Sequence, residues 1–447
     1  MSNVLDLYDQ TTFAGERATG TTNMLQCIWM YDRALDTDGL HRFYRNLRQG
    51  RLSRRIEPSP LPFGRHRWVS ASGRSTLEIA ETPRPRADLD AWLGEQTATV
   101  LDAEDGPEWH LAALPFTDGG AAVSLVISHC LTDGVGLCEA LADAACDRPD
   151  PIAWPAAGAR PLWRALAEDV RQTARDIPAV GRAAVSAARF ATRSSACDAP
   201  AAAPCTGSDQ PIAFPKATVF IDADDWDTRA ESLGGTSNGL LAGLAAHLAQ
   251  GMGRVNPDGA VDLTLPVNRR EAGDTRANAI TNVDFTVDPA PVASDLRGIR
   301  ASIKQALTRS QEEPNERFEL LPLAPLLPQW LIRKVVSVSA GSPTSVVSSN
   351  LGEIDPAAHR PDGTPADRFV MRSLGKGVTE AVMHRLGGLL VLLSGRTDDT
   401  VFVSVLSYQP GRDNSNDVLH EHISNALNDF GLTASFAWPA GLSRLSA

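Results

Sequence analysis

The residues best suited to chemistry lie between His129 and Gly134, in the short sequence HCLTDG. An imidazole can take up a proton near neutral pH, and the carboxylate of Asp133, four residues later, can hold that imidazole or pair with an Arg. The pattern predicts either a general base with a supporting carboxylate or a His and an Asp that merely close a turn. The spacing alone leaves both interpretations open.

An apolar run leads directly into this stretch and predicts a strand. Residues 121–128, AAVSLVIS, are apolar or small, which is typical of a buried strand. Asp133 and Gly134 then supply turn chemistry, because both residue types tolerate the left-handed backbone region. A helix is predicted over 135–145. We therefore expect His129 at the end of the strand, where its side chain can face a cavity.

The rest of the chain alternates between predicted strands and helices, which indicates mixed α/β sheets. The strands are expected at 21–33, 68–69, 77–79, 109–114, 217–221, 261–267, 285–287, 345–350, 389–393 and 400–408. The further helices are expected from Gly39 and at 87–100, 161–193, 224–232, 238–252, 294–307 and 418–427. A segment rich in Ala, Pro and Ser, 194–211, predicts a linker between an N-terminal part, 1–193, and a C-terminal part, 212–447.

Arginines recur along the predicted helix 161–193, which we expect to be interrupted near Pro178. A basic helix can lie on a membrane surface, so peripheral membrane contact is one interpretation. A crossover helix with one packed and one solvated face is the favoured interpretation.

Composition narrows the class of protein. The 447 residues fit about two to three domains, and a net charge of −12 with a pI near 5.3 argues against a nucleic-acid partner. The 6 cysteines lack pair spacing, so neither a disulfide nor a metal site is expected. The longest apolar run, Leu386–Leu393, is too short to span a membrane. These features predict a cytoplasmic enzyme.

A second motif offers different chemistry. Gly235, Ser237 and Gly239 match the G-x-S-x-G nucleophile elbow of serine hydrolases, which requires a strand directly before the turn. The preceding residues, 226–233, predict a helix instead, and Ser237 is interpreted as a helix cap. A serine hydrolase therefore stands as an alternative hypothesis.

The motifs together resemble the condensation-domain-like acyltransferases, and within them the wax ester synthase/diacylglycerol acyltransferase branch. The family signature His-His-x-x-x-Asp-Gly is matched at 128–134, with Ser128 in place of the first His. Further matches follow in the right order over nearly the whole chain: LDLYD at 5–9, GPEW at 106–109, TSNGLLA at 236–242, PVNR at 266–269, AN at 277–278, where the family often has Gly before the Asn, and SSNLG at 348–352.

The resemblance implies a fold and a set of site residues. The fold would be two chloramphenicol-acetyltransferase-like subdomains set in a V, with the active site at their interface. The catalytic residues would be His129, as general base, and Asp133, which in such enzymes usually turns from the cavity toward an Arg. Gly134 and Asn350 would bind substrate by donating hydrogen bonds to the reacting carbonyl oxygen.

Two further expectations belong to that resemblance. Arg54 or Arg55 is the expected partner of Asp133. Ser128 lies on the opposite face of the strand from His129, so the missing first His should affect packing more than chemistry.

The implied reaction is acyl transfer from a thioester, either acyl-CoA or a phosphopantetheinyl group on an acyl carrier protein, to a hydroxyl or an amine. Transfer would be direct, with no metal, no permanently bound cofactor and no covalent acyl-enzyme. A protein from the same family that binds a hydrophobic ligand or a carrier partner without transfer is the alternative.

Overall fold

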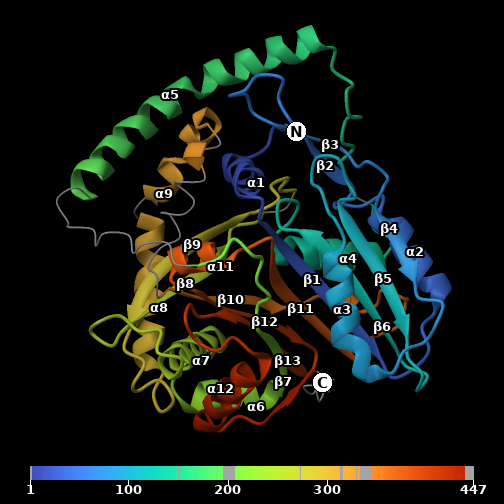
Figure 1. Cartoon of the computed structure of the whole chain (residues 1–447), viewed down its shortest axis with the longest axis vertical. Helices are drawn as coiled ribbons and strands as arrows, with labels where there is room; N and C mark the ends of the chain where they lie inside the picture. Colours follow the sequence, from blue (N-terminus) through green and yellow to red (C-terminus); the bar gives the residue numbers. More distant parts are fainter. Residues whose placement is uncertain are drawn as a thin grey trace.

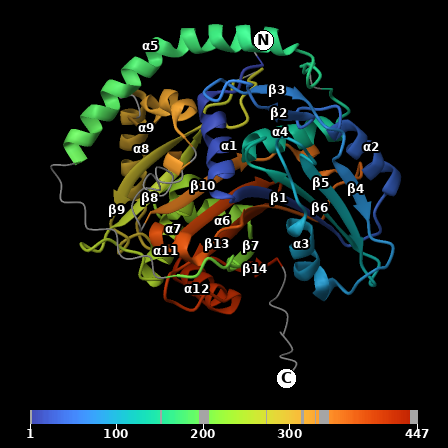
Figure 2. The same ribbon diagram turned by 45° about the horizontal axis from the view of Figure 1, so that its top comes forward.

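The computed structural model describes residues 3–149, 152–194, 207–271, 273–312, 316–328, 330–332 and 345–437. These residues form a mixed α/β structure with two large sheets, which confirms the predicted fold class (Figure 1). The sheets lie side by side, and helices cover their outer faces (Figures 1 and 2).

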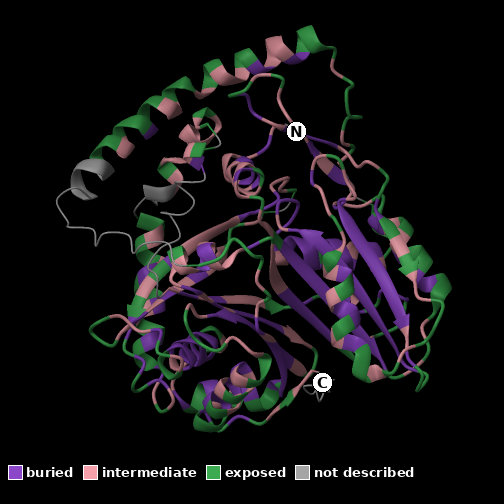
Figure 3. Ribbon diagram, in the orientation of Figure 1, coloured by how far each residue is buried: buried purple, intermediate pink, exposed green. Residues whose placement is uncertain are grey.

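The first sheet has five strands in the order β11-β1-β6-β5-β4. Its strands are β1 (Thr22–Tyr31), β4 (Thr76–Ile79), β5 (Trp109–Pro115), β6 (Ala121–Ser128) and β11 (Arg368–Lys376). β1 runs antiparallel to both β6 and β11, and β4 runs parallel to β5. Every residue of β6 is buried, as expected for an apolar strand in the middle of a covered sheet (Figure 3).

The second sheet has seven strands in the order β14-β7-β13-β12-β10-β8-β9. Its strands are β7 (Lys216–Asp222), β8 (Val261–Asn268), β9 (Ile280–Val287), β10 (Val346–Glu353), β12 (Leu389–Thr397), β13 (Thr400–Tyr408) and β14 (Ala434–Phe436). β10 runs parallel to both β8 and β12, whereas β13 is antiparallel to its two neighbours. A separate two-stranded ribbon joins β2 (Arg54–Glu57) and β3 (Arg67–Ser70).

Helices build a hydrophobic core on each sheet. They are α1 (Leu7–Thr19), α2 (Thr37–Leu47), α3 (Leu89–Ala98), α4 (Gly134–Ala145), α5 (Leu162–Ser194), α6 (Ala223–Ser232), α7 (Ser237–Gly251), α8 (Arg297–Glu312), α9 (Glu316–Glu319), α11 (Glu380–Leu386) and α12 (Asn416–Asp429), with short 3₁₀ turns η1 (Arg86–Asp88), η2 (Leu321–Leu326) and η3 (Pro356–His359). α6, α7, α8 and α12 pack on the seven-stranded sheet around the buried Trp226. Trp29 and Trp109 lie in the core of the five-stranded sheet.

β11 ties the two halves of the chain together. It lies in the C-terminal half of the sequence, yet it pairs with β1 along nine residues, from Thr22 opposite Lys376 to Met30 opposite Arg368. It also contacts β12 and β13 of the second sheet. Residues 195–206 of the expected linker lie outside the described residues, so the boundary at 194–211 stays a prediction.

Several features differ from the expectations drawn from the sequence. The helix over 161–193 is not interrupted, because α5 runs through Pro178. Pro178 and Ala174, whose carbonyl oxygen loses its helical donor, are both exposed, so water can take the place of the missing N–H group. The elements that were not predicted are α1, β2, α9, α11, β11 and β14.

Candidate active site

His129 stands directly after the last residue of β6. Its backbone N–H donates to the carbonyl oxygen of Asn23 at 2.9 Å, which extends the ladder between β6 and β1 by one residue. Its side chain is half-buried, and the imidazole ring makes no hydrogen bond or ion pair with any residue that the structure describes. The backbone is thus fixed while both ring nitrogens stay available.

The loop after His129 is held through its carbonyl groups. The side-chain amide of Asn278 donates to the carbonyl oxygen of His129 at 3.0 Å. Leu131 donates its N–H to the carbonyl oxygen of Ser128 at 3.0 Å, and its own carbonyl oxygen accepts from Nη2 of Arg54 at 3.0 Å. Donors from distant parts of the chain therefore fix a loop that has no regular secondary structure.

Asp133 caps α4 and does not reach toward His129 through any hydrogen bond. Its Oδ1 accepts from the N–H of Gly136 at 2.7 Å, as a helix N-cap does. Its Oδ2 accepts from Nη2 of Arg270 at 2.7 Å and from the N–H of Ala279 at 2.8 Å. The side chains of Asp133 and Arg270 are each 3% exposed, so this is a buried ion pair.

The prediction that Arg54 or Arg55 pairs with Asp133 was wrong. The guanidinium of Arg54 lies over the ring of Trp68, 4.1 Å from its centre, and donates to the carbonyl oxygens of Leu131 and Thr275. Arg55 donates to the carbonyl oxygen of Glu104 at 2.6 Å. The reason is geometric: N-capping of α4 directs Asp133 toward the loop between β8 and β9, and Arg270 comes from that loop.

Gly136 makes room for the ion pair. A Cβ at this position would lie 2.9 Å from Nη2 of Arg270 and 3.0 Å from Oδ1 of Asp133. Contacts that short would push the guanidinium out of place. The glycine in the first turn of α4 therefore serves the pairing of Asp133 with Arg270.

Asp9, on α1, binds the end of the loop between β8 and β9. Its carboxylate accepts from the N–H groups of Ala277 and Asn278 at 2.8 and 2.9 Å, and from the side-chain amide of Asn278 at 3.1 Å. Burial raises the pKa of Asp9 to about 6, although these hydrogen bonds act to lower it. Asn278 thus links the carboxylate of Asp9 to the carbonyl group of His129.

Ser128, which stands where the first His of the motif would be, faces α1. It is 2% exposed, and its Oγ accepts from the N–H of Cys130 at 3.1 Å. The carboxyl group of Glu16 approaches from α1, where it accepts from the N–H of Asn23 at 3.1 Å. Burial raises the pKa of Glu16 to about 7, and hydrogen bonds with Cys130, Asn23 and Ser128 act to lower it.

Gly134 lies where the two sheets approach each other. A Cβ on Gly134 would lie 2.7 Å from Cδ2 of Leu351, on β10, and 3.5 Å from Sδ of Met371, on β11. The neighbour of Leu351, Asn350, uses its side chain elsewhere: Nδ2 donates to Oδ1 of Asn238 at 2.5 Å, and Oδ1 accepts from the N–H of Gly352 at 2.9 Å. On β10, the side chain of Leu351 lies next to Gly134, whereas the amide of Asn350 is bound to Asn238 and Gly352.

The structure around Ser237 is not that of a nucleophile elbow. Ser237 is the first residue of α7 and follows the helix α6, with no strand between them. Its Oγ accepts from Nε1 of Trp226 at 2.9 Å. Thr236 is the N-cap, through its hydrogen bond from the N–H of Gly239 at 3.2 Å, so the cap lies one residue earlier than expected. Ser237 therefore has no nucleophile-elbow geometry.

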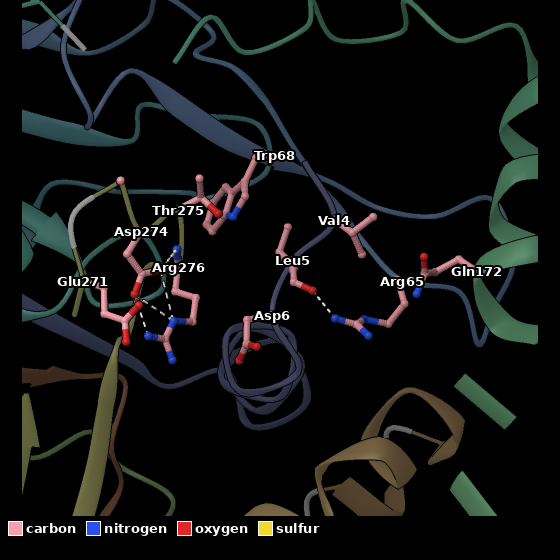
Figure 4. Close-up of a pocket in the computed structure, with 11 residues that line it drawn as sticks. Val4, Leu5, Asp6, Arg65, Trp68, Gln172, Glu271, Asp274, Thr275 and Arg276 are labelled. Atoms are coloured by element: carbon pink, nitrogen blue, oxygen red, sulfur yellow. Dashed lines mark hydrogen bonds and ion pairs between the residues drawn. The ribbon is translucent and has the colours of Figure 1, made fainter. Parts of the chain in front are cut away.

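A polar cavity of about 590 Å³ lies behind the loop between β8 and β9. Figure 4 shows Trp68, Thr275 and Arg276 on one side of it, and Arg65 and Gln172 on the other. Arg276 is held by Asp274 at 2.5 Å, and Arg65 donates to the carbonyl oxygen of Leu5. Because Thr275 also accepts from Arg54, the cavity wall and the support of the motif loop share residues.

Sequence comparison identifies no relative: no protein-family model and no curated protein matches the chain. Solved structures do match. The first condensation domain of the CDA synthetase superposes with a TM-score of 0.59 at 15% identity, over 96% of each chain. Wax ester synthase/diacylglycerol acyltransferase from Marinobacter aquaeolei VT8 superposes with a TM-score of 0.55 at 17% identity, over 96% of this chain and 100% of that one.

A variant of the starter condensation domain of rhizomide synthetase RzmA, in complex with C8-CoA, also superposes, with a TM-score of 0.53 at 12% identity. It covers 97% of this chain and 95% of its own. The chain therefore has the fold of condensation domains and of wax ester synthase/diacylglycerol acyltransferase, as the motifs predicted. Within the described residues, no helix is both long enough and apolar enough to cross a membrane.

Proposed function

We propose that the protein is an acyltransferase that moves an acyl group from a thioester to a hydroxyl or an amine, with His129 as the general base. The proposal rests on the difference between the fixed backbone of His129 and its unpaired imidazole ring. Its backbone and the following loop are fixed by Asn23, Asn278 and Arg54, whereas its imidazole has no partner among the described residues. A ring held in place by its backbone and free at its nitrogens suits proton transfer.

The start of α4 supplies donors for the reacting carbonyl oxygen. The N–H groups of Gly136 and Leu137 are used by the side chain and the carbonyl group of Asp133. The N–H groups of Gly134 and Val135 have no acceptor among the described residues. Free N–H groups at a helix N-terminus stabilise negative charge, so they fit the oxygen of a tetrahedral intermediate better than the occupied amide of Asn350.

The proposed reaction is a direct transfer. His129 takes the proton of the acceptor while the acceptor oxygen or nitrogen forms a bond to the thioester carbonyl carbon, and the carbonyl oxygen gains negative charge near Gly134. When the carbonyl re-forms, the carbon–sulfur bond breaks and the thiolate takes the proton from His129. No metal and no covalent acyl-enzyme enters this scheme. Asp133 positions the loop through Arg270, and it is a positioning residue.

The donor class is proposed by analogy with the structural neighbours, and the acceptor class from the chemistry of an imidazole base. One neighbour holds C8-CoA, and others are condensation domains, which supports acyl-CoA or a carrier-bound phosphopantetheinyl thioester as the donor. A hydroxyl or an amine needs its proton removed before or during attack, and a neutral imidazole can do this for either.

The first prediction tests this role of His129. Incubation of the purified protein with a panel of acyl-CoA thioesters and alcohol or amine acceptors should give acylated products detectable by mass spectrometry. His129→Ala should lower kcat/KM by about 10²–10⁴, the contribution of a general base, while its thermal unfolding stays that of the parent.

The exposed His41 provides a matched control, since His41→Ala should leave turnover unchanged. Full activity of His129→Ala would overturn the proposal. Binding of acyl thioesters without turnover across the panel would instead identify a protein that binds ligand or carrier without transfer.

A further inference from the structure

α5 is a surface helix that directs several charged side chains inward and several large apolar side chains outward. It runs along the outside of the molecule in both ribbon views (Figures 1 and 2). A helix on a protein surface ordinarily buries its apolar face and exposes its polar one. The inner side of α5 instead carries Asp169, which accepts from Ser59 at 2.6 Å and pairs with Arg67 at 3.0 Å.

The other inward contacts are two polar pairs and the packing of α5 on the turn η2. Asp176 pairs with Arg65 at 3.4 Å, and Ser186 donates to Glu319 of α9 at 2.8 Å. Among the described side chains of α5, the fully buried apolar ones are Ala165 and Ala183. Leu166 and Val180 are half-buried, whereas several other large apolar residues of α5 stay exposed.

Those larger residues form a stripe on the outer side. Trp163 is 72% exposed, Val170 54%, Ile177 62% and Val185 52%. The first three follow one another at intervals of seven residues, and Val185 comes eight residues after Ile177. Spacings of seven or eight residues are about two helical turns, so the four side chains lie on one face. Figure 3 shows the exposed outer side of α5.

Arginines lie along one side of this stripe. Arg171, Arg175 and Arg182 are exposed and have no acidic partner within the described residues. The acidic residues of α5 are Glu168, Asp169 and Asp176, and each of them is paired with an Arg. The outer face is therefore apolar and cationic, although the whole chain has a net charge of −12.

We propose that α5 binds the surface of a membrane containing anionic lipids, with its axis in the plane of the membrane and its apolar stripe among the acyl chains. An exposed apolar stripe bordered by arginines is the pattern of an interfacial helix, because acyl chains cover the apolar residues and lipid phosphates pair with the cations. With roughly 1.5 Å per residue along a helix of 33 residues, α5 offers a long contact line. The contact is independent of the proposed acyl transfer.

The same stripe could be covered by a second copy of the chain, but the arginines argue for lipid. In a symmetric dimer the like-charged borders of two stripes would face each other or solvent, with no acidic residue of the outer face to pair with them. An anionic surface offers a partner to every exposed Arg at once.

The test is sedimentation of the full chain with vesicles, without substrate. The protein should bind vesicles of equal parts phosphatidylcholine and phosphatidylglycerol, should bind pure phosphatidylcholine vesicles at least tenfold more weakly, and should lose affinity as salt is raised. The variant Val170→Glu/Ile177→Glu should bind the anionic vesicles at least tenfold more weakly. The variant Arg171→Gln/Arg175→Gln/Arg182→Gln should lose most of the salt dependence.

A matched control places the same change elsewhere. Val100 lies just after α3 and is 74% exposed. The variant Val100→Glu should bind vesicles as the parent does. Brominated acyl chains in the anionic vesicles should quench fluorescence in the parent more than in Trp163→Phe. Circular dichroism of each variant confirms the fold.

Two results would overturn the proposal. One is that the folded variant Val170→Glu/Ile177→Glu binds anionic vesicles as well as the parent does, or that the folded parent does not bind them. The other is a parent that is dimeric without vesicles and becomes monomeric in Val170→Glu/Ile177→Glu, which would assign the stripe to a second copy. Neither result bears on His129, so failure of this proposal is distinguishable from failure of the proposed acyl transfer.

Discussion

Arg270 is the residue on which the geometry of the motif depends most. Its guanidinium reaches the carboxylate of Asp133 and the carbonyl oxygens of Ala277 and Arg276, all between 2.7 and 3.1 Å. One planar cation thus joins α4 to both ends of a loop turn, which a lysine could not do with a single nitrogen. The motif at 129–134 and the loop between β8 and β9 are thus joined by one buried cation.

We expect Arg270→Met to lower the free energy of unfolding by about 3–5 kcal/mol, because it leaves the carboxylate of Asp133 buried without its cation. Asp133→Asn combined with Arg270→Met should cost less than the sum of the two single changes, by about 1 kcal/mol or more. Urea unfolding of the three variants measures this coupling. The exposed neighbour Arg269 supplies the control, since Arg269→Met should change stability by less than about 0.5 kcal/mol. Strict additivity would show that the pair does not act as a unit.

Glu16 adds a pH dependence at the same site. Burial raises its pKa from 4.5 to about 7 in the folded chain, so the unfolded chain releases this proton at lower pH. The contribution of Glu16 to stability is therefore fully present below about pH 4.5 and is lost as the pH rises through 7. Glu16→Gln removes this titration, and we expect the variant to gain stability relative to the parent between these pH values. Chemical unfolding at a series of pH values would reveal the trend, and a constant difference would contradict it.

At the scale of elements, the sequence predicted what local patterns determine. The hairpin of β5 and β6, the helix α4 and the pair β12 and β13 are continuous apolar or alternating runs bounded by turn residues, and they lie where expected. The position of His129 after β6 follows from the same pattern. Pro178 misled the prediction of α5, since an exposed helix tolerates the lost hydrogen bond.

The two longest elements that were missed, β11 and α1, depend on contacts between distant residues. β11 contains Arg372, a charge that obscures its strand pattern, and this Arg is buried because Nε donates to Gln26 of β1 at 2.7 Å. α1 carries several Thr residues and a Gly, although its N-cap, Asp6, is a recognisable signal. The pairing of Asp133 with Arg270 joins residues 137 positions apart, and that of Asp9 with Ala277 spans 268. Such contacts leave no local pattern in the sequence.

At the scale of the whole molecule, the two parts predicted from the sequence share their most important contacts. β1 would have an open edge without β11, and an open edge strand invites aggregation. Asp9 and Asp133 would each be buried without the groups between Arg270 and Ala279 that now satisfy them. The N-terminal part therefore contains the motif and some of the residues that hold it, such as Arg54, but it lacks Arg270 and Asn278.

The final prediction follows from this division of contacts. Residues 1–193 expressed alone should show no cooperative urea unfolding, because β1 has lost its pairing with β11 and two buried carboxylates have lost their donors. Co-expression with residues 194–447 should restore a complex that unfolds in one transition, since β11 can then complete the five-stranded sheet. Cooperative unfolding and a native-like near-ultraviolet circular dichroism spectrum of 1–193 alone would contradict the prediction. They would show instead that the core around Trp29 and Trp109 is sufficient to hold the His129 loop.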